Sequence, residues 1–311
     1  MTTDRPVARP GAPALTRRRR STWGGWRSSF VPPVAIAIGL YFATFFLAPF
    51  LISFGLALYN WDLLSTAVFL GLGNFGTMAR DELFLNGLRV SFLFVAIELP
   101  IILVLQLGVG ALLSRLRQRL QRILLAMIFV PVITPWLVVI MMWGFIFYPR
   151  VGLLAGLGQL LGVTIHNPLA SPQSALYAVI AITIWKFIGF GAVVFLVGIN
   201  ELPQSLYDAA MIDGGGFWAQ FRHVTLPLLQ PVMLGMSILS FIGAMQVFEP
   251  FFLMTGGGPQ NATRSLVLYV YEQSFVHLRF GYASAMTLAL FGILLAVSIV
   301  QLVVGRTRWE Y

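Results

Sequence analysis

A small set of polar side chains lies within long hydrophobic segments of this chain. Glu98, Lys186, Gln246 and Glu249 are each flanked by apolar residues. A charge at the centre of a membrane costs about 2.5–3.5 kcal/mol on insertion scales, so each of these side chains requires a partner or a function. Lys186 could pair with Glu98 or with Glu249, and the sequence leaves both pairings open.

Gln246 and Glu249 are spaced three residues apart, which predicts that they share one face of a helix. Phe248 and Phe252 lie beside them. A sugar is bound by such groups, because its hydroxyls need hydrogen bonds and its C–H faces stack on rings. A hydrogen bond that holds two helices together is the alternative. A substrate pathway is therefore one interpretation of this segment.

Ser284 belongs to a small-residue face at the start of the last hydrophobic segment, formed with Gly281, Ala283 and Ala285. Small residues on one helix face allow another helix to approach closely. Lining of a pathway and plain helix packing are both open for this face. The candidate pathway residues are Gln246, Phe248, Glu249, Phe252, Lys186 and Ser284.

A polar segment, residues 200–231, separates two hydrophobic ones. Ser205 and Asp208 resemble a helix start in which Asp208 holds a free backbone N–H, and they predict a first short helix over about 206–212. Three glycines from Gly214 permit a sharp turn. A second short helix is predicted from near Phe217, with Pro227 ending it.

Enzymatic chemistry finds little support in these residue types. The chain has no cysteine, and its three histidines lie on separate loops without metal-ligand spacing. No glycine-rich phosphate loop followed by Lys-Ser or Lys-Thr occurs, so ATP hydrolysis by this chain is not expected. Asp208 and Asp213 could bind a metal in an enzyme acting on lipid-linked substrates, but a third acidic ligand is missing nearby. We predict no catalytic residue, metal or cofactor on this chain.

The composition places the chain in a membrane. Hydrophobic residues make up 58% of the 311 residues and charged residues 10%, with a mean hydropathy of +0.85. Soluble domains carry about 25% charged residues. The net charge of +9 does not indicate nucleic-acid binding, because the basic residues form no surface interleaved with aromatic ones.

Six segments are long and apolar enough to cross a bilayer, and they predict an all-α polytopic membrane protein. A span needs roughly 20 apolar residues. The predicted spans are residues 32–59, 88–113, 123–148, 175–199, 228–253 and 282–304.

The arginines predict the orientation of these spans, because basic flanks stay in the cytoplasm. One side of the predicted topology carries fourteen arginines: seven in the N-terminal tail, four in residues 114–122, one in residues 200–227 and two at the C-terminus. The other side has five. Both termini and the 200–227 loop are therefore expected on the cytoplasmic side.

Three regions follow from this pattern. Residues 1–30 are proline-rich and basic and predict a disordered cytoplasmic tail. The apolar run that follows is too long for a usual signal peptide, so we interpret it as an uncleaved first helix. Residues 31–305 form the membrane domain, with the loop 200–227, and residues 306–311 a short cytoplasmic tail.

The 200–231 segment resembles the cytoplasmic "EAA" loop of permease subunits of bacterial ABC importers, in the carbohydrate-uptake branch typified by maltose permeases. The matching positions are Asp208, Ala209, Ala210, Asp213, Gly214, Gly215, Phe221, Leu226 and Pro227. Asp208 stands where the family usually has Glu, and Gly215 where it usually has Ala. Further stretches recur in the family's order, among them Gly71–Phe75, Tyr148–Leu154, Ile184–Lys186, Thr255–Pro259 and Gly281–Ala285.

This resemblance implies a six-helix permease of a cell membrane that imports sugars or oligosaccharides. The implied partners are a second permease, two ATP-binding subunits that carry ATP and Mg²⁺, and an extracytoplasmic solute-binding protein. Asp208 would face a basic residue of the ATP-binding subunit, Gly214 would let the turn enter a cleft there, and Phe221 would anchor an apolar contact. Polyol and glycerol-phosphate importers share the same body and are the alternative. A secondary transporter would require internal repeats, which the sequence does not display.

Overall fold

The computed structural model describes residues 24–149 and 151–305. The chain divides into two compact units, residues 1–52 and 53–311. Most of the predicted N-terminal tail, residues 1–23, and the C-terminal tail, residues 306–311, lie outside the described residues. Residues 24–30 belong to the first helix, which begins before the apolar run.

The first unit is helical. It contains α1 (Gly24–Phe42), η1 (Ala43–Leu47) and the start of α2 (Ala48–Leu56). Residues Pro33–Leu56 form a stretch of 24 residues that is long and apolar enough to span a membrane. The predicted span over 32–59 agrees with it closely.

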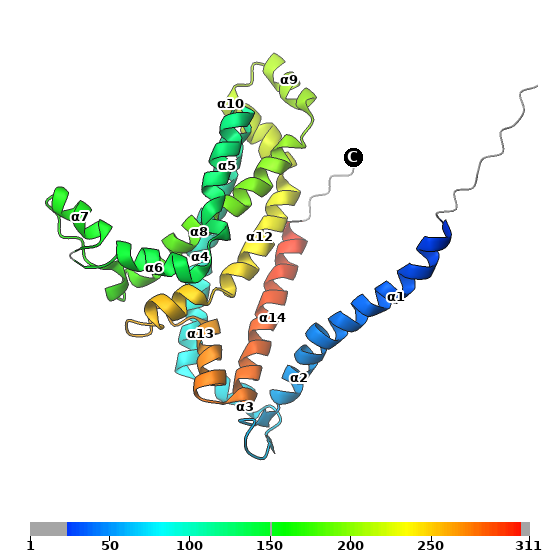
Figure 1. Ribbon diagram of the computed structural model, residues 1–311, viewed down its shortest axis with the longest axis vertical. Helices are drawn as coiled ribbons and strands as arrows, with labels where there is room; N and C mark the ends of the chain where they lie inside the picture. Colours follow the sequence, from blue (N-terminus) through cyan, green and yellow to red (C-terminus); the bar gives the residue numbers. More distant parts are fainter. Residues whose placement is uncertain (1–23, 150, 306–311) are drawn as a thin grey trace, which may run out of the picture. The chain divides into compact units, whose positions relative to one another are not determined.

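The second unit is a helical bundle with one small hairpin (Figure 1). The strands β1 (Tyr59–Asn60) and β2 (Val68–Phe69) pair antiparallel, with Tyr59 opposite Phe69. The helices in chain order are α3 (Gly73–Met78), α4 (Glu82–Ser114), α5 (Gln118–Ile133), α6 (Trp136–Ile146), α7 (Leu153–Leu160), η2 (Pro168–Ala170), α8 (Ala175–Asn200), α9 (Gln204–Ile212), α10 (Phe217–Gln220), η3 (Phe221–Thr225), α11 (Leu226–Leu228), α12 (Gln230–Met245), η4 (Phe251–Thr255), α13 (Leu266–Tyr271), η5 (Glu272–Val276) and α14 (Phe280–Val304).

The predicted all-α membrane fold is confirmed. Within the described residues, four helices are long and apolar enough to cross a membrane, and up to six spans result if each of two bent pairs counts as one. The first pair, α5 and α6, bends by 97° within the predicted span 123–148. The second joins Phe217–Leu228 to α12 with a bend of 68°.

The predicted fifth span, residues 228–253, is wrong at its end. The helix α12 stops at Met245, and Gln246 and Glu249 do not share one helix face as their spacing predicted. Pro250 has no N–H to donate to the carbonyl of Gln246, so the helical bond at this point is lost. The chain turns at Gln246 instead, with φ −104° and ψ 3°.

The core of the second unit lies along the pairing of α4 with α8. Gly191 of α8 lies against the side chain of Gln106, and a Cβ atom at position 191 would overlap the amide group of that glutamine. The Gln106 amide donates to the carbonyl of Phe187 (3.1 Å). A small residue here brings the two helices close enough for a side-chain bond across the interface, as small residues do in membrane helices.

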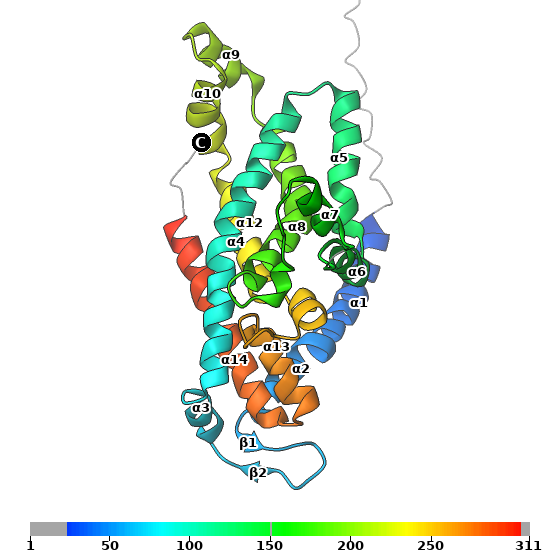
Figure 2. The same cartoon turned by 90° about the vertical axis from the view of Figure 1, so that its left-hand side faces the viewer.

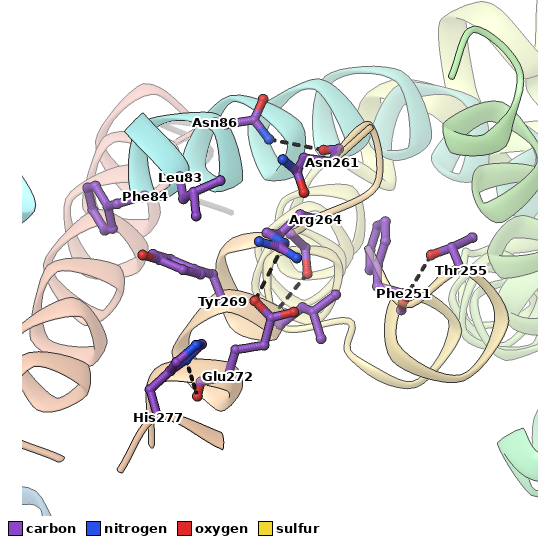
Figure 3. Close-up of polar contacts among 12 residues, drawn as sticks. Leu83, Phe84, Asn86, Phe251, Thr255, Asn261, Arg264, Tyr269, Glu272 and His277 are labelled. Atoms are coloured by element: carbon purple, nitrogen blue, oxygen red, sulfur yellow. Dashed lines mark hydrogen bonds and ion pairs between the residues drawn. The ribbon is translucent and has the colours of Figure 1, made fainter. Parts of the chain in front are cut away.

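The two ends of this unit differ in structure. The short helices α9 and α10 lie at one end, whereas α3, the hairpin and η5 lie at the opposite end, and α4 runs from one towards the other (Figures 1 and 2). At the second end, the loop before α13 is bound to the start of α4, since the Asn86 amide donates to the carbonyl of Asn261 (3.0 Å; Figure 3). Arg264 and Glu272 form an ion pair of 3.4 Å beside it.

Candidate functional site

Lys186 holds the break between α5 and α6. Its ammonium group donates to the carbonyls of Thr134 (2.6 Å) and Pro131 (2.9 Å). Pro135 cannot donate to the Pro131 carbonyl, so this oxygen loses its helical partner. Two prolines inside one apolar segment, Pro131 and Pro135, predict a bend because each removes a backbone donor, and the 97° angle between α5 and α6 confirms it. The partner that satisfies the freed carbonyls is a cation from α8.

Lys186 therefore forms an ion pair with neither Glu98 nor Glu249, the two partners that the sequence left open. The only ion pair among the described residues is that of Arg264 with Glu272. Lys186 is 3% exposed, and its ammonium group lies 5.0 Å from the ring centroid of Trp136 and 5.6 Å from that of Phe187. Aromatic faces and carbonyl dipoles stabilise the buried ammonium group here. The sequence analysis considered only carboxylates as partners of Lys186 and therefore missed these contacts.

Glu98, Gln246 and Glu249 come together at one cavity of about 340 Å³ between α4, α8 and α12. Gln106, Thr183 and Ser240 add polar groups to its wall, and Trp136, Phe187 and Phe190 add rings. Glu98 is 3% exposed, and its Oε2 atom makes no hydrogen bond within residues 24–149 and 151–305; nor does Oε1 of the buried Gln106. Buried polar atoms without a partner are rare in proteins, and here they line a space that a polar ligand could fill.

Three other candidate pathway residues lie elsewhere. Phe248 and Phe252 stack on each other with ring centroids 5.0 Å apart, and both contact Tyr271 rather than the cavity. Ser284 is half-buried in α14, between Ala283 and Ala285, which are buried. None of the three lines the cavity. The aromatic wall comes instead from α6 and α8, which the local spacing around Glu249 could not reveal.

At the far end of α4, Asp81 is bound by two tyrosines. The Tyr269 and Tyr282 hydroxyls donate to its carboxylate at 2.7 and 2.6 Å, and it accepts the backbone N–H of Leu83 (2.9 Å) as the N-cap of α4. Burial raises the pKa of this carboxyl, but the hydrogen bonds outweigh it and leave the pKa below its usual value. This carboxylate joins α4, α13 and α14.

The polar segment 200–231 forms two short helices joined by a tight turn, as predicted. Gly214 has φ +79°, its N–H donates to Met211 O (3.0 Å), and the N–H of Gly215 donates to Ala210 O (2.8 Å). This is a Schellman C-cap of α9, with glycine at the left-handed position. A Cβ atom at position 215 would lie 2.7 Å from the carbonyl oxygen of Ala210. The family's usual alanine would therefore not fit this turn without a shift.

Two details of this segment differ from the prediction. Asp208 is not a helix cap: α9 begins at Gln204, and Asp208 lies one turn inside it, where its carboxylate accepts the Gln204 amide (3.3 Å). Pro203 immediately before Gln204 fixes a backbone that can start the helix earlier. The second helix ends at Leu228, one residue beyond the predicted end at Pro227, and the bend follows at Leu229.

The surface of this segment is apolar at three positions that sequence reasoning missed. Ile212 is 87% exposed, Trp218 74% and Met211 54%. Phe221 and Leu226, in contrast, pack inside the chain against a cluster that contains Leu107 and Phe195. The signal in the sequence is the presence of large apolar residues in a loop otherwise rich in polar ones.

Most of the remaining predicted positions of this loop are at its surface, whereas Ala210 and Pro227 are half-buried. Asp208, Ala209, Asp213 and Gly214 are exposed. Among the described residues, no three His, Asp or Glu side chains gather as a metal ion would require. The arrangement offers a cavity inside the bundle, with Glu98, Gln246 and Glu249 in a mainly apolar wall, and a protruding loop at one end.

Comparison with known proteins agrees with these two features. Residues 106–309 match the family described as the inner membrane component of binding-protein-dependent transport systems. The trehalose/maltose transport system permease protein MalF of Thermococcus litoralis is 35% identical over 243 residues, which cover 77% of this chain and 81% of that protein. The sn-glycerol-3-phosphate transport system permease protein UgpA of Agrobacterium fabrum is 30% identical over 78% of this chain and 83% of its own.

A solved structure shares the fold. It is a bacterial alginate ABC transporter in complex with an alginate pentasaccharide-bound periplasmic protein, with a TM-score of 0.80 and 17% identity over 92% of this chain and 97% of the matched one. The family match covers well over half of the chain. The chain belongs to the family of inner membrane components of binding-protein-dependent transport systems, the permeases of ABC importers.

Proposed function

We propose that this chain is the sugar-conducting permease subunit of an importer driven by separate ATP-binding subunits. A second permease would complete the pathway, and an extracytoplasmic protein would deliver the solute. The chain's own residues would bind the solute in the cavity beside Glu98 and receive the conformational signal at the loop 200–227. The observation that carries this proposal is the presence, in one membrane bundle, of a cavity lined by apolar residues and a few polar side chains, and of a polar loop with three exposed apolar side chains.

The loop would dock through Met211, Ile212 and Trp218. An exposed apolar surface on a polar segment marks a protein contact, because such side chains gain by leaving water. The rigid turn at Gly214 holds α9 and α10 in a fixed relation, so the three side chains are presented together. Phe221 supports this surface from within the chain, which revises its expected role as the anchor of the contact.

The test of this assembly is affinity purification of the tagged chain from its host in mild detergent, followed by mass spectrometry. We expect an ATP-binding subunit and a second permease with the wild-type chain, and loss of the ATP-binding subunit with Trp218→Asp. Leu160→Asp is the matched control, because Leu160 is 84% exposed on α7, away from the loop. Wild-type chain that purifies alone would refute the assembly.

The cavity favours a neutral, hydroxyl-rich solute over an anionic one. Glu98 and Glu249 line it, whereas no Lys or Arg of the described part of the chain does. The nearby Lys186 directs its ammonium group at helix carbonyls. Carboxylates and amides bond sugar hydroxyls, but a phosphate would meet like charge and find no arginine fork. A sugar or oligosaccharide therefore fits better than a glycerol-phosphate type solute, and a polyol remains the second candidate.

Uptake of radiolabelled solutes by the host and by a strain lacking this chain tests the substrate class. We expect uptake of one or more neutral sugars, from a panel containing maltose, trehalose and lactose, to depend on the chain. Uptake of glycerol 3-phosphate should not depend on it. Dependence for the phosphate alone would contradict the assignment.

The proposal also places the loop 200–227 on the cytoplasmic side of the membrane. The arginine-rich 114–122 loop and the loop 200–227 lie at one end of the second unit, since Arg115 contacts Gln220. Arg264 and Arg279 belong to elements at the opposite end. This distribution supports a cytoplasmic position for the loop 200–227, which we call the docking loop. Cysteine labelling with an impermeant reagent in intact cells tests it: Asp213→Cys should be protected and Asp62→Cys labelled.

A further inference from the structure

Arg115 joins the docking loop to the end of α4. It is the C-cap residue of that helix, and its Nη2 atom donates to Oε1 of Gln220 (3.3 Å). The guanidinium carbon lies 4.6 Å from the ring centroid of Phe217. Gln220 is 6% exposed, and its own amide donates to the carbonyl of Gly215 (3.1 Å). Two consecutive hydrogen bonds thus connect α4 to the glycine turn.

The helix that Arg115 ends also reaches the solute cavity. Glu98, Ile102 and Gln106 of α4 line that cavity, and Asp81 fixes the helix start to two tyrosines. The helix α4 runs over 33 residues, with Pro100 inside it, and Gln106 lies between Pro100 and Arg115. A displacement of the helix end would therefore be carried along this part of α4 to Gln106 in the cavity wall, since packed helices move as rigid elements.

The region around Arg115 is only partly filled. A cavity of about 290 Å³ lies between the loop and the ends of α4 and α8, and Ser114, Arg115, Tyr207 and Gln220 line it. The first half of the loop, α9, has a further polar connection to its second half, in which the Tyr207 hydroxyl lies 3.0 Å from that of Thr225. The turn at Gly215 can thus shift relative to the helix ends, and Arg115 bridges the space across which it would shift.

We propose that Arg115 and Gln220 are positioning residues that transmit movement of the docking loop to α4 and so to the solute cavity. This inference rests on the proposed function, because it requires a partner that moves the loop. Arg115 acts through Gln220 and touches neither the solute nor the nucleotide. Its side chain is exposed, so its contribution to the stability of the chain is small, and the consequence of losing it falls on coupling.

The test uses the complex purified through the tagged chain and reconstituted in vesicles, with solute uptake and ATP hydrolysis measured together. Couplings between sites amount to about 5- to 150-fold. With Arg115→Ala we expect the ratio of solute imported to ATP hydrolysed to fall by about fivefold or more. The amount of ATP-binding subunit recovered and the KM for ATP should not change. Arg115→Lys, which keeps a donor and a cation beside the ring, should restore most of the ratio.

Arg117 supplies the control. It lies two residues further on, in the same exposed loop, and its side chain makes no hydrogen bond or ion pair within the described part of the chain. Arg117→Ala should leave the ratio unchanged. An unchanged ratio with Arg115→Ala in an intact complex would overturn the inference alone, whereas a wild-type chain that recovers no ATP-binding subunit would overturn the proposed function itself.

Discussion

The three consecutive glycines of the docking loop, Gly214, Gly215 and Gly216, differ in how well each position accommodates a side chain. Replacing them by alanine should therefore destabilise the turn to different extents. Gly214 has φ +79° with open space around the Cβ position. Gly215 would place a Cβ atom 2.7 Å from Ala210 O, and Gly216 has φ −70° with nothing within 4 Å. Replacing Gly214 by alanine therefore tests backbone strain, and replacing Gly215 by alanine tests steric overlap. Replacing Gly216 by alanine introduces neither effect and serves as the control.

The expected costs follow from these geometries. Gly214→Ala should destabilise the turn by about 1–2 kcal/mol, the cost of a left-handed conformation for a residue with a Cβ atom. Gly215→Ala should weaken the same cap by displacing the carbonyl that accepts its N–H. Gly216→Ala should stay within about 0.5 kcal/mol of wild type, because the lower entropy of the unfolded chain offsets a poorer N-cap.

Hydrogen exchange of the Gly215 amide measures this directly, since that N–H bonds Ala210 O across the turn. A loss of 1–2 kcal/mol corresponds to exchange about 5- to 30-fold faster. The order of exchange rates should be Gly214→Ala above Gly216→Ala, with Gly216→Ala close to wild type. Equal rates for these two variants would refute the argument that the turn depends on a left-handed glycine.

Three further predictions concern the membrane bundle. Lys186→Met leaves the Pro131 carbonyl without a hydrogen-bond donor. In a Pro135→Ala background a backbone N–H can replace the lysine, so Lys186→Met should destabilise that protein by about 1 kcal/mol less than it destabilises the wild type. Equal losses of thermal stability in both backgrounds would contradict the capping role of Lys186. Asp81→Ala should destabilise by at least about 1 kcal/mol at pH 7 as a lost N-cap. Folding lowers the pKa of the Asp81 carboxyl, so the charged carboxylate stabilises the folded state fully at pH values above the unfolded pKa of about 3.9. This contribution to stability should vanish as the pH falls through the pKa of the folded state, and melting curves recorded against pH measure it. Glu98→Ala should raise the KM for uptake about tenfold through a lost bond to the solute, with recovery of the ATP-binding subunit unchanged; an unchanged KM would remove Glu98 from the binding wall.

The sequence predicted the elements that depend on local patterns. Long apolar runs located the spans, and the Gly214 turn was readable from glycine alone. The bend between α5 and α6 followed from Pro131 and Pro135, because proline removes a backbone donor wherever it occurs. The starts and ends of the short helices were less accurate, as Asp208 and Pro227 show, since several residues compete for each boundary.

The composition of the site could not be read from the chain in the same way. Gln246 and Glu249 reach the cavity from a broken segment, and Glu98 joins them from another helix. Phe248 and Phe252 are near them in sequence, yet they pack on Tyr271. The partners of Lys186 are backbone carbonyls, which every residue carries. Contacts of these kinds depend on tertiary packing and leave no spacing in the sequence.

The most direct test of the account is ATP hydrolysis by the material that purifies with the tagged chain from its own host, compared between wild type and Trp218→Asp. The account predicts ATPase activity with the wild-type chain and its loss with the variant, while the variant still inserts in the membrane. ATPase activity that is absent from the wild-type preparation, or equal in both, would contradict a permease driven through the loop 200–227.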